Sequence, residues 1–478
     1  MQKRIVSLFL ALFMAVTMTT GVSAKTNDWY EFRTNDNVID AKLPTTEDST
    51  KLDWVHSFLD GKFYVTYSNP IIGDECIYIA VDSELYKLDK DGNVLQKATL
   101  NNTIAFNAYL AYGNGMVFVA LGNGMIQAFD GQSLTSLWLS QVEGNFTSPL
   151  TYYNGYLYTG TTEYDDSYNI VGGQYFALSV SDDDPNSNLE TKYNSWSYQE
   201  QAGGYYWSDA TIINNQYLVF VSTAGTLVAK DITSDNLNTI TLDSNISIRS
   251  GVCYGDGHLY IGSQNGKLYK VAFNNDGTFG QVETAMMLNG NGQITGTPTY
   301  VDGTLYFGGK NGSAFNAPGF IAKMDVNTLQ LQSIEVVGNV QSSILVTTGY
   351  DDAVYGYYTI NSEPGGLYVF KDTGTEFTTD TLYEPEDAYK NYNMGSAISD
   401  GNKLYFTNDS GALFALENSE QPTDNNPTST PPAQTTDTDT SSTPDQVVNS
   451  VKTGDDQSLV SMLTLIISGA VLVVLKKD

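Results

Sequence analysis

The sequence has few of the residues on which metal and nucleophilic sites usually depend. Its 478 residues include two cysteines, Cys76 and Cys253, and two histidines, His56 and His258. No spacing among these four fits a zinc site. A Ser-His-Asp or Cys-His arrangement would need one of the histidines, and His258 starts an expected strand in "GDGHLYIG", where a structural role is the simpler interpretation. We therefore assign no catalytic residue.

Positive charge is also scarce, with 23 Lys and Arg against 54 Asp and Glu and a net charge of -31. Such a surface repels nucleic acid and anionic lipid headgroups. Divalent cations, basic partners and neutral ligands such as sugars remain open. The stretches "DKDGN" at Asp89 and "SDDDPNSN" near Asp182 begin like Ca²⁺ loops but lack the Gly and Glu that complete one. Ca²⁺ stays open, without an assigned ligand set.

Long amphipathic helical patterns are missing between Tyr64 and Glu417, where one phrase recurs about eight times. Examples are "ECIYIAVDSELYKLDKDG", "GMVFVALGNGMIQAFDG", "GHLYIGSQNGKLYKVAF" and "NKLYFTNDSGALFALEN". Each copy alternates apolar and polar residues on both sides of a Gly- or Asn-containing turn, which is typical of a β-hairpin. A shorter strand precedes each copy, and a further extended piece such as "LTSLWLSQ" follows most of them. Four strands per unit predict an all-β fold, an eight-bladed β-propeller.

The last copy stops after its third strand, at Glu417. We expect the unassigned stretch "KLDWVHSFLD" before the first copy to supply the missing strand and close the ring. Trp54 would then have the packing role of Trp138 in "SLTSLWLSQ".

These repeats resemble the PQQ-like β-propeller repeat, in which an apolar strand, a "DG" turn, "LYALD" and a later Trp follow one another. The resemblance implies the ring. It does not settle function, because the family includes quinone-dependent dehydrogenases and non-enzymatic scaffold proteins. The dehydrogenases carry an adjacent cysteine pair, calcium ligands and a catalytic Asp around the quinone. Here Cys76 and Cys253 fall in the first and fifth blades, too far apart for a disulfide, so PQQ is not expected as a cofactor.

The two ends of the chain predict export and attachment. A basic start, an apolar run and small residues before Lys25 indicate a signal peptide over 1–24. An extended segment over 25–50 precedes the propeller at 51–417, and a Pro-, Thr- and Asp-rich linker over 418–450 follows it. Residues 451–478 combine a short motif, an apolar run long enough for a transmembrane helix and a basic tail.

This last segment resembles a cell-wall sorting signal of Gram-positive bacteria. In that family sortase cuts L-P-x-T-G between Thr and Gly and joins the Thr to peptidoglycan. Carried over to Val451, Lys452, Thr453 and Gly454, the match makes Thr453 the attached residue. Ser450 and Val451 stand where the motif has Leu and Pro, so a plain membrane anchor is the alternative.

A ligand-binding site is expected where the chain enters the innermost strands around the central channel. Aromatic, amide and hydroxyl groups alternate there, a combination that suits a neutral polar ligand. The candidate ligand-binding residues are Tyr67, Phe106, Asn107, Asn145, Phe146, Tyr206, Trp207, Asp209, Arg249, Gln293, Gln341, Asn391, Tyr392 and Asn393. Arg249 either binds a carboxylate or phosphate or pairs with a neighbouring Asp. Two long excursions, "TEYDDSYNIVGG" and "NSWSYQEQAGGYYWSDA", are expected to form a lip or surface loops.

The sequence thus predicts a secreted, surface-anchored propeller that binds a glycan, a peptide, a small nutrient or a protein partner without catalysis. One alternative is an extracellular enzyme, either of the PQQ-like superfamily or acting on polysaccharides. The other is a scaffold on which surface proteins assemble.

Overall fold

The computed structural model describes residues 28–419 except 63, 107–108, 188–189, 244–245 and 288–291. The expected signal peptide, the linker from residue 420 on and the sorting motif with its apolar run lie outside the described residues. Within the described residues, no helix is long and apolar enough to span a bilayer.

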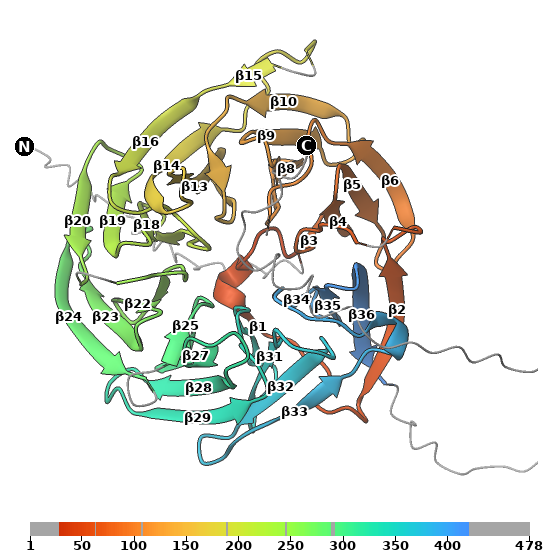
Figure 1. Ribbon diagram of the computed structural model, residues 1–478, viewed down its shortest axis with the longest axis vertical. Coiled ribbons are helices and arrows are strands. Elements are labelled where there is room, and N and C mark those ends of the chain that lie inside the picture. The colour runs from red at the N-terminus through yellow and green to blue at the C-terminus, as the bar shows by residue number, and fades with distance from the viewer. Residues whose placement is uncertain are drawn as a thin grey trace, which may run out of the picture.

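Eight β-sheets surround a central axis (Figure 1), which confirms the predicted eight-bladed propeller. From the axis outward, the first blade consists of β3 (Ile71–Gly73), β4 (Cys76–Val81), β5 (Glu84–Leu88) and β6 (Val94–Thr99), and the second of β7 (Ala111–Gly113), β8 (Met116–Ala120), β9 (Ile126–Asp130) and β10 (Ser136–Ser140). The third blade consists of β12 (Thr151–Tyr153), β13 (Tyr156–Tyr164), β14 (Ile170–Ser179) and β16 (Asn194–Glu200). The fourth consists of β17 (Thr211–Ile213), β18 (Tyr217–Val221), β19 (Thr226–Asp231) and β20 (Leu237–Thr241). The fifth blade consists of β21 (Cys253–Gly255), β22 (His258–Gly262), β23 (Lys267–Phe273) and β24 (Phe279–Met286), and the sixth of β26 (Thr299–Val301), β27 (Thr304–Asn311), β28 (Gly319–Asp325) and β29 (Leu331–Val336). The seventh blade consists of β30 (Leu345–Thr347), β31 (Val354–Tyr358), β32 (Leu367–Asp372) and β33 (Phe377–Tyr383). The eighth consists of β34 (Ile398–Ser399), β35 (Lys403–Asn408), β36 (Ala412–Asn418) and, on the outside, β2 (Thr50–Ser57).

Short strands extend four of these blades. β1 (Val38–Ile39) pairs with β30 on the channel side, and β15 (Glu190–Lys192) pairs with β10 on the outside. β11 (Asn145–Phe146) and β25 (Gly292–Ile294) pair with β13 and β27 near the channel. The described residues also form two single-turn 3-10 helices, η1 (Thr34–Asn37) and η3 (Asp387–Tyr389).

The core lies between blades, because neighbouring sheets cover each other's faces. Every residue of β18 is buried, whereas the outermost strand β6 alternates between exposed and half-buried residues. The hairpin turns have the expected chemistry: Asn154 and Gly155 take φ values of 47° and 82° between β12 and β13. Positive φ at both positions matches the right-handed twist of the flanking strands.

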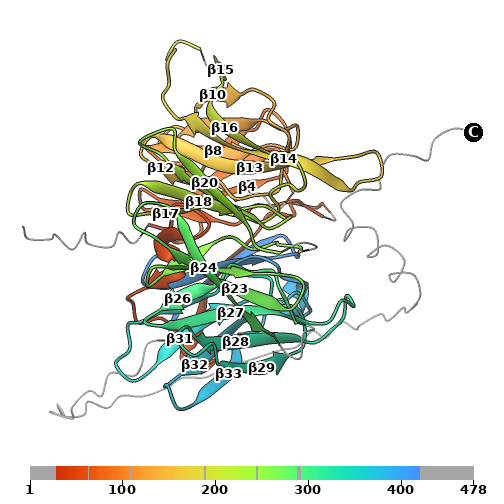
Figure 2. The same ribbon diagram turned by 90° about the vertical axis from the view of Figure 1, so that its left-hand side faces the viewer.

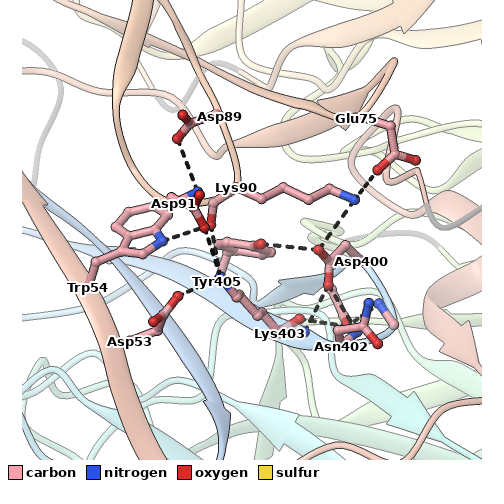
Figure 3. A network of polar contacts seen from close by, with 12 residues as sticks. Asp53, Trp54, Glu75, Asp89, Lys90, Asp91, Asp400, Asn402, Lys403 and Tyr405 are labelled. Atoms are coloured by element: carbon pink, nitrogen blue, oxygen red, sulfur yellow. Dashed lines mark hydrogen bonds and ion pairs between the residues drawn. The ribbon is translucent and has the colours of Figure 1, made fainter.

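Ring closure follows the sequence prediction. β2 pairs antiparallel with β36 from Thr50↔Asn418 to Ser57↔Ala412, so the two ends of the propeller share one blade. The seam with the first blade is a polar network (Figure 3). The Trp54 indole N–H donates to the Lys90 carbonyl at 2.9 Å, and the Lys403 ammonium donates to the same carbonyl at 3.0 Å.

The Trp54 ring also covers the backbone of Gly92, where an added Cβ would lie 2.6 Å from the indole. Trp138 contacts the following blade in the same way, its indole N–H donating to the Val180 carbonyl at 3.4 Å. Trp54 therefore has the packing role expected from the repeat.

The two cysteines lie in β4 and β21, in the first and fifth blades, as free thiols. Cys253 is buried. Cys76 is only half-buried, because it is the first residue of β4 and follows the turn at Asp74 and Glu75.

The segment before β2 occupies the channel, and we call residues 28–44 the strap. Figure 1 shows its 3-10 helix close to the axis. The Trp29 and Tyr30 carbonyls accept from the N–H groups of Ile72 and Tyr112 at 2.8 and 2.7 Å, and the Glu31 carboxylate accepts from Tyr152 N–H at 2.8 Å. The strap thus hydrogen-bonds to the innermost strands of the first three blades. It then pairs with the seventh through β1.

Replacing Trp54 by Ala should lower the free energy of unfolding by about 2–3 kcal/mol, the lower part of the range for aromatic truncations because the ring is half-buried. Chemical denaturation followed by circular dichroism measures this change. Phe315→Ala, at a side chain 50% exposed, is the control and should change stability by less than about 0.5 kcal/mol. Equal losses in both variants would contradict a role for Trp54 in closing the ring.

Candidate functional site

All the candidate residues lie in segments that lead into innermost strands. Because successive strands of a blade are antiparallel and each blade starts at its innermost strand, these eight segments reach the same face of the ring. We call this face the mouth. Asn107 lies outside the described residues. Twelve of the other thirteen candidates fall into three groups, and Phe106 belongs to none of them.

Three candidates are buried. Phe146 is 4% exposed and packs against Phe176. Asp209 is 3% exposed and faces the channel. Asn393 is 1% exposed, and its side-chain oxygen accepts from Gly395 N–H at 2.9 Å. Because these three side chains are buried, they cannot contact a ligand at the mouth.

A second group holds the mouth loops in place. The Tyr67 hydroxyl donates to Asp409 at 2.7 Å, and burial together with that carboxylate raises its pKa well above the usual value. Gln341 accepts from the Asn361 side-chain amide at 2.6 Å. Asn391 accepts from the Tyr392 N–H at 2.9 Å, and the Tyr392 carbonyl accepts from Asp409 N–H at 2.8 Å.

Two further members of this group act through their strands. Asn145 in β11 donates to the Thr162 carbonyl at 3.2 Å, and Gln293 in β25 is registered against Lys310. Phe106 is 42% exposed and lies apart from these contacts.

The third group consists of Tyr206, Trp207 and Arg249, which we call the mouth cluster. The guanidinium carbon of Arg249 lies 4.5 Å from the centre of the Tyr206 ring and 5.9 Å from that of Trp207. The two rings are 5.1 Å apart at 54°. All three side chains are half-buried. The structure thus brings two aromatic rings and a cation together from neighbouring blades, the fourth and fifth.

Backbone contacts fix this geometry. Trp207 has a φ of 58°, a conformation unusual for a bulky residue. Its N–H donates to the Thr147 carbonyl of the third blade at 2.7 Å, and Ser208 donates to the Val221 carbonyl at 2.6 Å. Next to Arg249, Ser250 donates to the Gly262 carbonyl at 3.0 Å. Bonds to three blades therefore hold the cluster, and an outlying backbone angle of this kind is often found at ligand sites.

Arg249 does not pair with an acid. Among the described residues, no carboxylate lies within ion-pair distance of its guanidinium, and no hydrogen-bond acceptor is found for its five N–H donors. The structural alternative, a pair with a neighbouring Asp, is therefore absent from this part of the chain.

Two neighbours of the cluster are absent from the candidates chosen from sequence. Tyr164, at the end of β13, has its pKa raised by burial and by Tyr206, while Arg249 lowers it. Lys310, near the end of β27, has its pKa lowered by burial and by the charge of Arg249. β13 and β27 are the second strands of their blades, counted from the axis, and each second strand runs toward the mouth. Tyr164 and Lys310 therefore lie at the mouth. Adding the ends of those strands to the candidate segments would have found both residues.

Both long excursions shape this face. "TEYDDSYNIVGG" forms the end of the β13–β14 hairpin, which projects beyond the ring in Figure 2 and carries Tyr168 with 63% of its surface exposed. "NSWSYQEQAGGYYWSDA" forms β16 and then the loop that carries Tyr206 and Trp207.

Deeper in the channel, a buried ion pair anchors the strap. Arg33 and Asp209 approach to 2.8 Å with both side chains 4% exposed. Arg33 also donates to Thr211 Oγ1 at 3.3 Å, to the Val252 carbonyl at 3.2 Å and to the Pro298 carbonyl at 3.5 Å. One side chain therefore bonds to the fourth, fifth and sixth blades. This contact accounts for Asp209, which the sequence had suggested as a ligand-binding acid.

Beside this pair is a cavity of about 190 Å³, bordered by strap residues and by the innermost strands β12 and β17. Glu31 faces it. Burial, together with the nearby charges of Asp209 and Asp36, raises the pKa of Glu31 to about 8, although the Tyr152 N–H and Arg33 oppose the shift. At neutral pH this carboxyl group therefore carries a proton.

The residues present do not fit a calcium-bound quinone of the kind found in propeller dehydrogenases. The two thiols are in blades one and five, and strap residues border the cavity beside the axis. No group of three or more His, Cys, Asp or Glu able to hold a metal ion occurs within the described part of the chain. We derive no step through such a cofactor.

Comparisons with known proteins agree with the fold. Residues 70–279 match the family described as outer membrane protein assembly factor BamB. Among solved structures, a europium-containing methanol dehydrogenase is similar with a TM-score of 0.57 and 11% identity, over 82% of this chain and 98% of that one.

Two further structures are similar. Quinohemoprotein alcohol dehydrogenase from Comamonas testosteroni has a TM-score of 0.60 and 11% identity, over 82% and 81% of the two chains. BamB from Moraxella catarrhalis has a TM-score of 0.52 and 12% identity, over 77% and 99%. Curated protein sequences give no significant match. At these identities the similarity shows the fold, a PQQ-like propeller, and no activity.

Replacing Arg33 by Met should cost about 3–5 kcal/mol of stability, because Asp209 is then buried without a counter-charge. The double variant Arg33→Met/Asp209→Leu should recover most of this loss, since no lone charge remains. Urea denaturation of both variants measures the effect. Equal losses would show that the ion pair does not anchor the strap.

Stability should depend on the protonation of Glu31. The folded chain keeps the proton up to pH about 8, whereas a Glu of ordinary pKa 4.5 in the unfolded chain loses it earlier. The contribution of Glu31 to stability therefore falls as the pH rises from about 4.5 to 8. Glu31→Gln should flatten the fall in melting temperature over this range and be more stable than the wild type at pH 9. Identical pH profiles would contradict the shifted pKa.

Proposed function

We propose that this chain is a secreted, surface-tethered and non-catalytic β-propeller that binds an extracellular glycan at the mouth of its ring. The mouth cluster is the observation that carries the proposal. Tyr206 and Trp207 present half-buried aromatic rings, held by bonds to neighbouring blades, next to an Arg that pairs with no acid among the described residues. Ring faces pack against the C–H faces of sugars, and the polar groups beside them orient hydroxyls.

The ends of the chain support the setting of this function. Export is supported by the expected signal peptide over 1–24. Attachment to peptidoglycan by sortase at Thr453, or to the membrane by the apolar run, is supported by the order of motif, apolar residues and lysines over 451–478. The linker over 418–450 then serves as a spacer that keeps the mouth away from the cell surface.

Binding without catalysis fits the chemistry of the cluster. It contains no carboxylate pair, and Asp209, the buried carboxylate two residues after Trp207, is paired with Arg33. Acid–base cleavage of a glycosidic bond requires two carboxylates that flank it. A cation and two rings can hold a sugar in place but cannot supply that pair.

A glycan-binding screen on the full chain tests the proposal. Trp207→Ala should weaken the best glycan by about tenfold or more, because aromatic residues contribute most at binding sites of this kind. Tyr193→Ala is the control: Tyr193 is 69% exposed next to β15, remote from the mouth, and its loss should leave binding unchanged. Absence of any glycan ligand, or binding indifferent to Trp207, would overturn the proposal.

A further inference from the structure

Two cations lie near each other at the mouth. Arg249 precedes β21 in the fifth blade, and Lys310 lies near the end of β27 in the sixth. Ser250, which follows Arg249, donates to the Gly262 carbonyl at 3.0 Å, and the carbonyl of the next residue, Ser263, accepts from Ile294 N–H at 3.0 Å. Ile294 is in turn registered against Gly309, the residue before Lys310. Burial and the charge of Arg249 lower the pKa of Lys310. Among the described residues, no carboxylate lies within 4.0 Å of either one, and the Lys310 ammonium reaches only the Ser313 and Ala314 carbonyls, at 3.4 and 3.2 Å.

This arrangement stands out in so acidic a chain. With 54 acidic side chains for 23 basic ones, carboxylates are available in excess. Two other lysines with little exposure use them: half-buried Lys323 contacts Asp372 at 2.6 Å, and buried Lys192 contacts Glu190 at 3.0 Å. Two adjacent, partly desolvated cations destabilise one another unless an anion lies between them. The chain provides none in its described part.

Two of the three acids of the nearby hairpin are engaged elsewhere, and no ion pair is found for the third, Asp166, among the described residues. Asp165 accepts from the N–H groups of Ser167 and Asn169, both at 2.8 Å, within its own turn. Glu163 accepts from the Gln199 side-chain amide at 3.4 Å. Neither forms an ion pair with Arg249 or Lys310.

The N–H donors of Arg249 have no acceptor within the described part of the chain. Its contact with the Tyr206 ring at 4.5 Å is a contact with a ring face and uses none of its five N–H groups. A guanidinium fork binds a carboxylate through two parallel hydrogen bonds, and a neighbouring ammonium adds a third. Partial burial strengthens each of these bonds relative to bulk water.

We propose that Arg249 and Lys310 form a subsite for the carboxylate of an acidic sugar whose ring lies against Tyr206 and Trp207. This inference rests on the proposed glycan-binding function and specifies its ligand class. The rings favour a sugar over an acidic peptide, because the Trp207 ring, whose centre lies farther from the guanidinium than that of Tyr206, can pack against the C–H face of a pyranose, whereas a Glu or Asp side chain offers only a short aliphatic stem.

The test measures binding of the full chain, by calorimetry, to acidic oligosaccharides and to their methyl esters. The panel contains oligogalacturonate, oligomannuronate, a hyaluronan tetrasaccharide and sialyllactose. At least one acid should bind about tenfold or more tightly than its neutral ester, as expected for a charge-assisted hydrogen bond in a partly buried site. Raising NaCl to 0.5 M should reduce this preference, because salt screens the attraction.

Variants assign the preference to the two cations. Arg249→Gln and Lys310→Gln should each remove most of the preference for the acid over the ester. Lys371→Gln is the matched control, since Lys371 also lies over a ring, 5.9 Å from the centre of Tyr355, but at the end of β32 away from the mouth. It should leave the ratio of affinities unchanged. Unaltered melting temperatures confirm that the variants fold.

The outcomes separate the two proposals. If neutral glycans bind through Trp207 and no acid is preferred to its ester, the carboxylate subsite is wrong and the glycan-binding function stands. A preference for the acid that survives both Gln variants also overturns the subsite. If a poly-glutamate peptide binds and no glycan does, the sugar assignment is wrong, and binding of nothing in the panel or in the neutral screen overturns both proposals.

Discussion

The antiparallel pairing of β2 with β36 is the contact on which the other features of the ring depend. It joins Lys51 to Glu417, 366 positions apart, and places both ends of the propeller in one blade. The entropic cost of closing a loop grows only slowly with its length, so pairing two strands this far apart in the sequence costs little more than pairing closer ones. Without it, the first and last blades would each leave a sheet face without a neighbour, and β36 would expose an unpaired edge.

Closure also defines the channel, and the strap fills it. A propeller core lies between neighbouring blades, so the axis itself has no apolar filling of its own. Here the backbone of Trp29 and Tyr30 and the side chains of Glu31 and Arg33 satisfy polar groups on six blades. The buried Arg33–Asp209 pair fixes the position of the strap around the axis. Because Asp209 is buried and paired with Arg33, its carboxylate is not available to a ligand.

The mouth brings together side chains from all the blades. Each blade delivers its first strand from the same face, so side chains from distant sequence positions meet around one opening. The fourth and fifth blades deliver two rings and an Arg, and the sixth adds Lys310. The strap lies in the channel behind them, so the surface around the proposed site is built by loops and strand ends.

Sequence periodicity by itself determined the number of blades, the place of β2 in the last one and the role of Trp54, because alternating strands and turn residues are local signals that repeat in every copy. Tertiary structure decided what local patterns do not encode. Arg33 lies in a segment without a repeat, so its pairing with Asp209 had no signal; an exposed aspartate and a buried one look alike in sequence. Arg249 and Lys310 are 61 positions apart, and they become neighbours only because consecutive blades pack side by side.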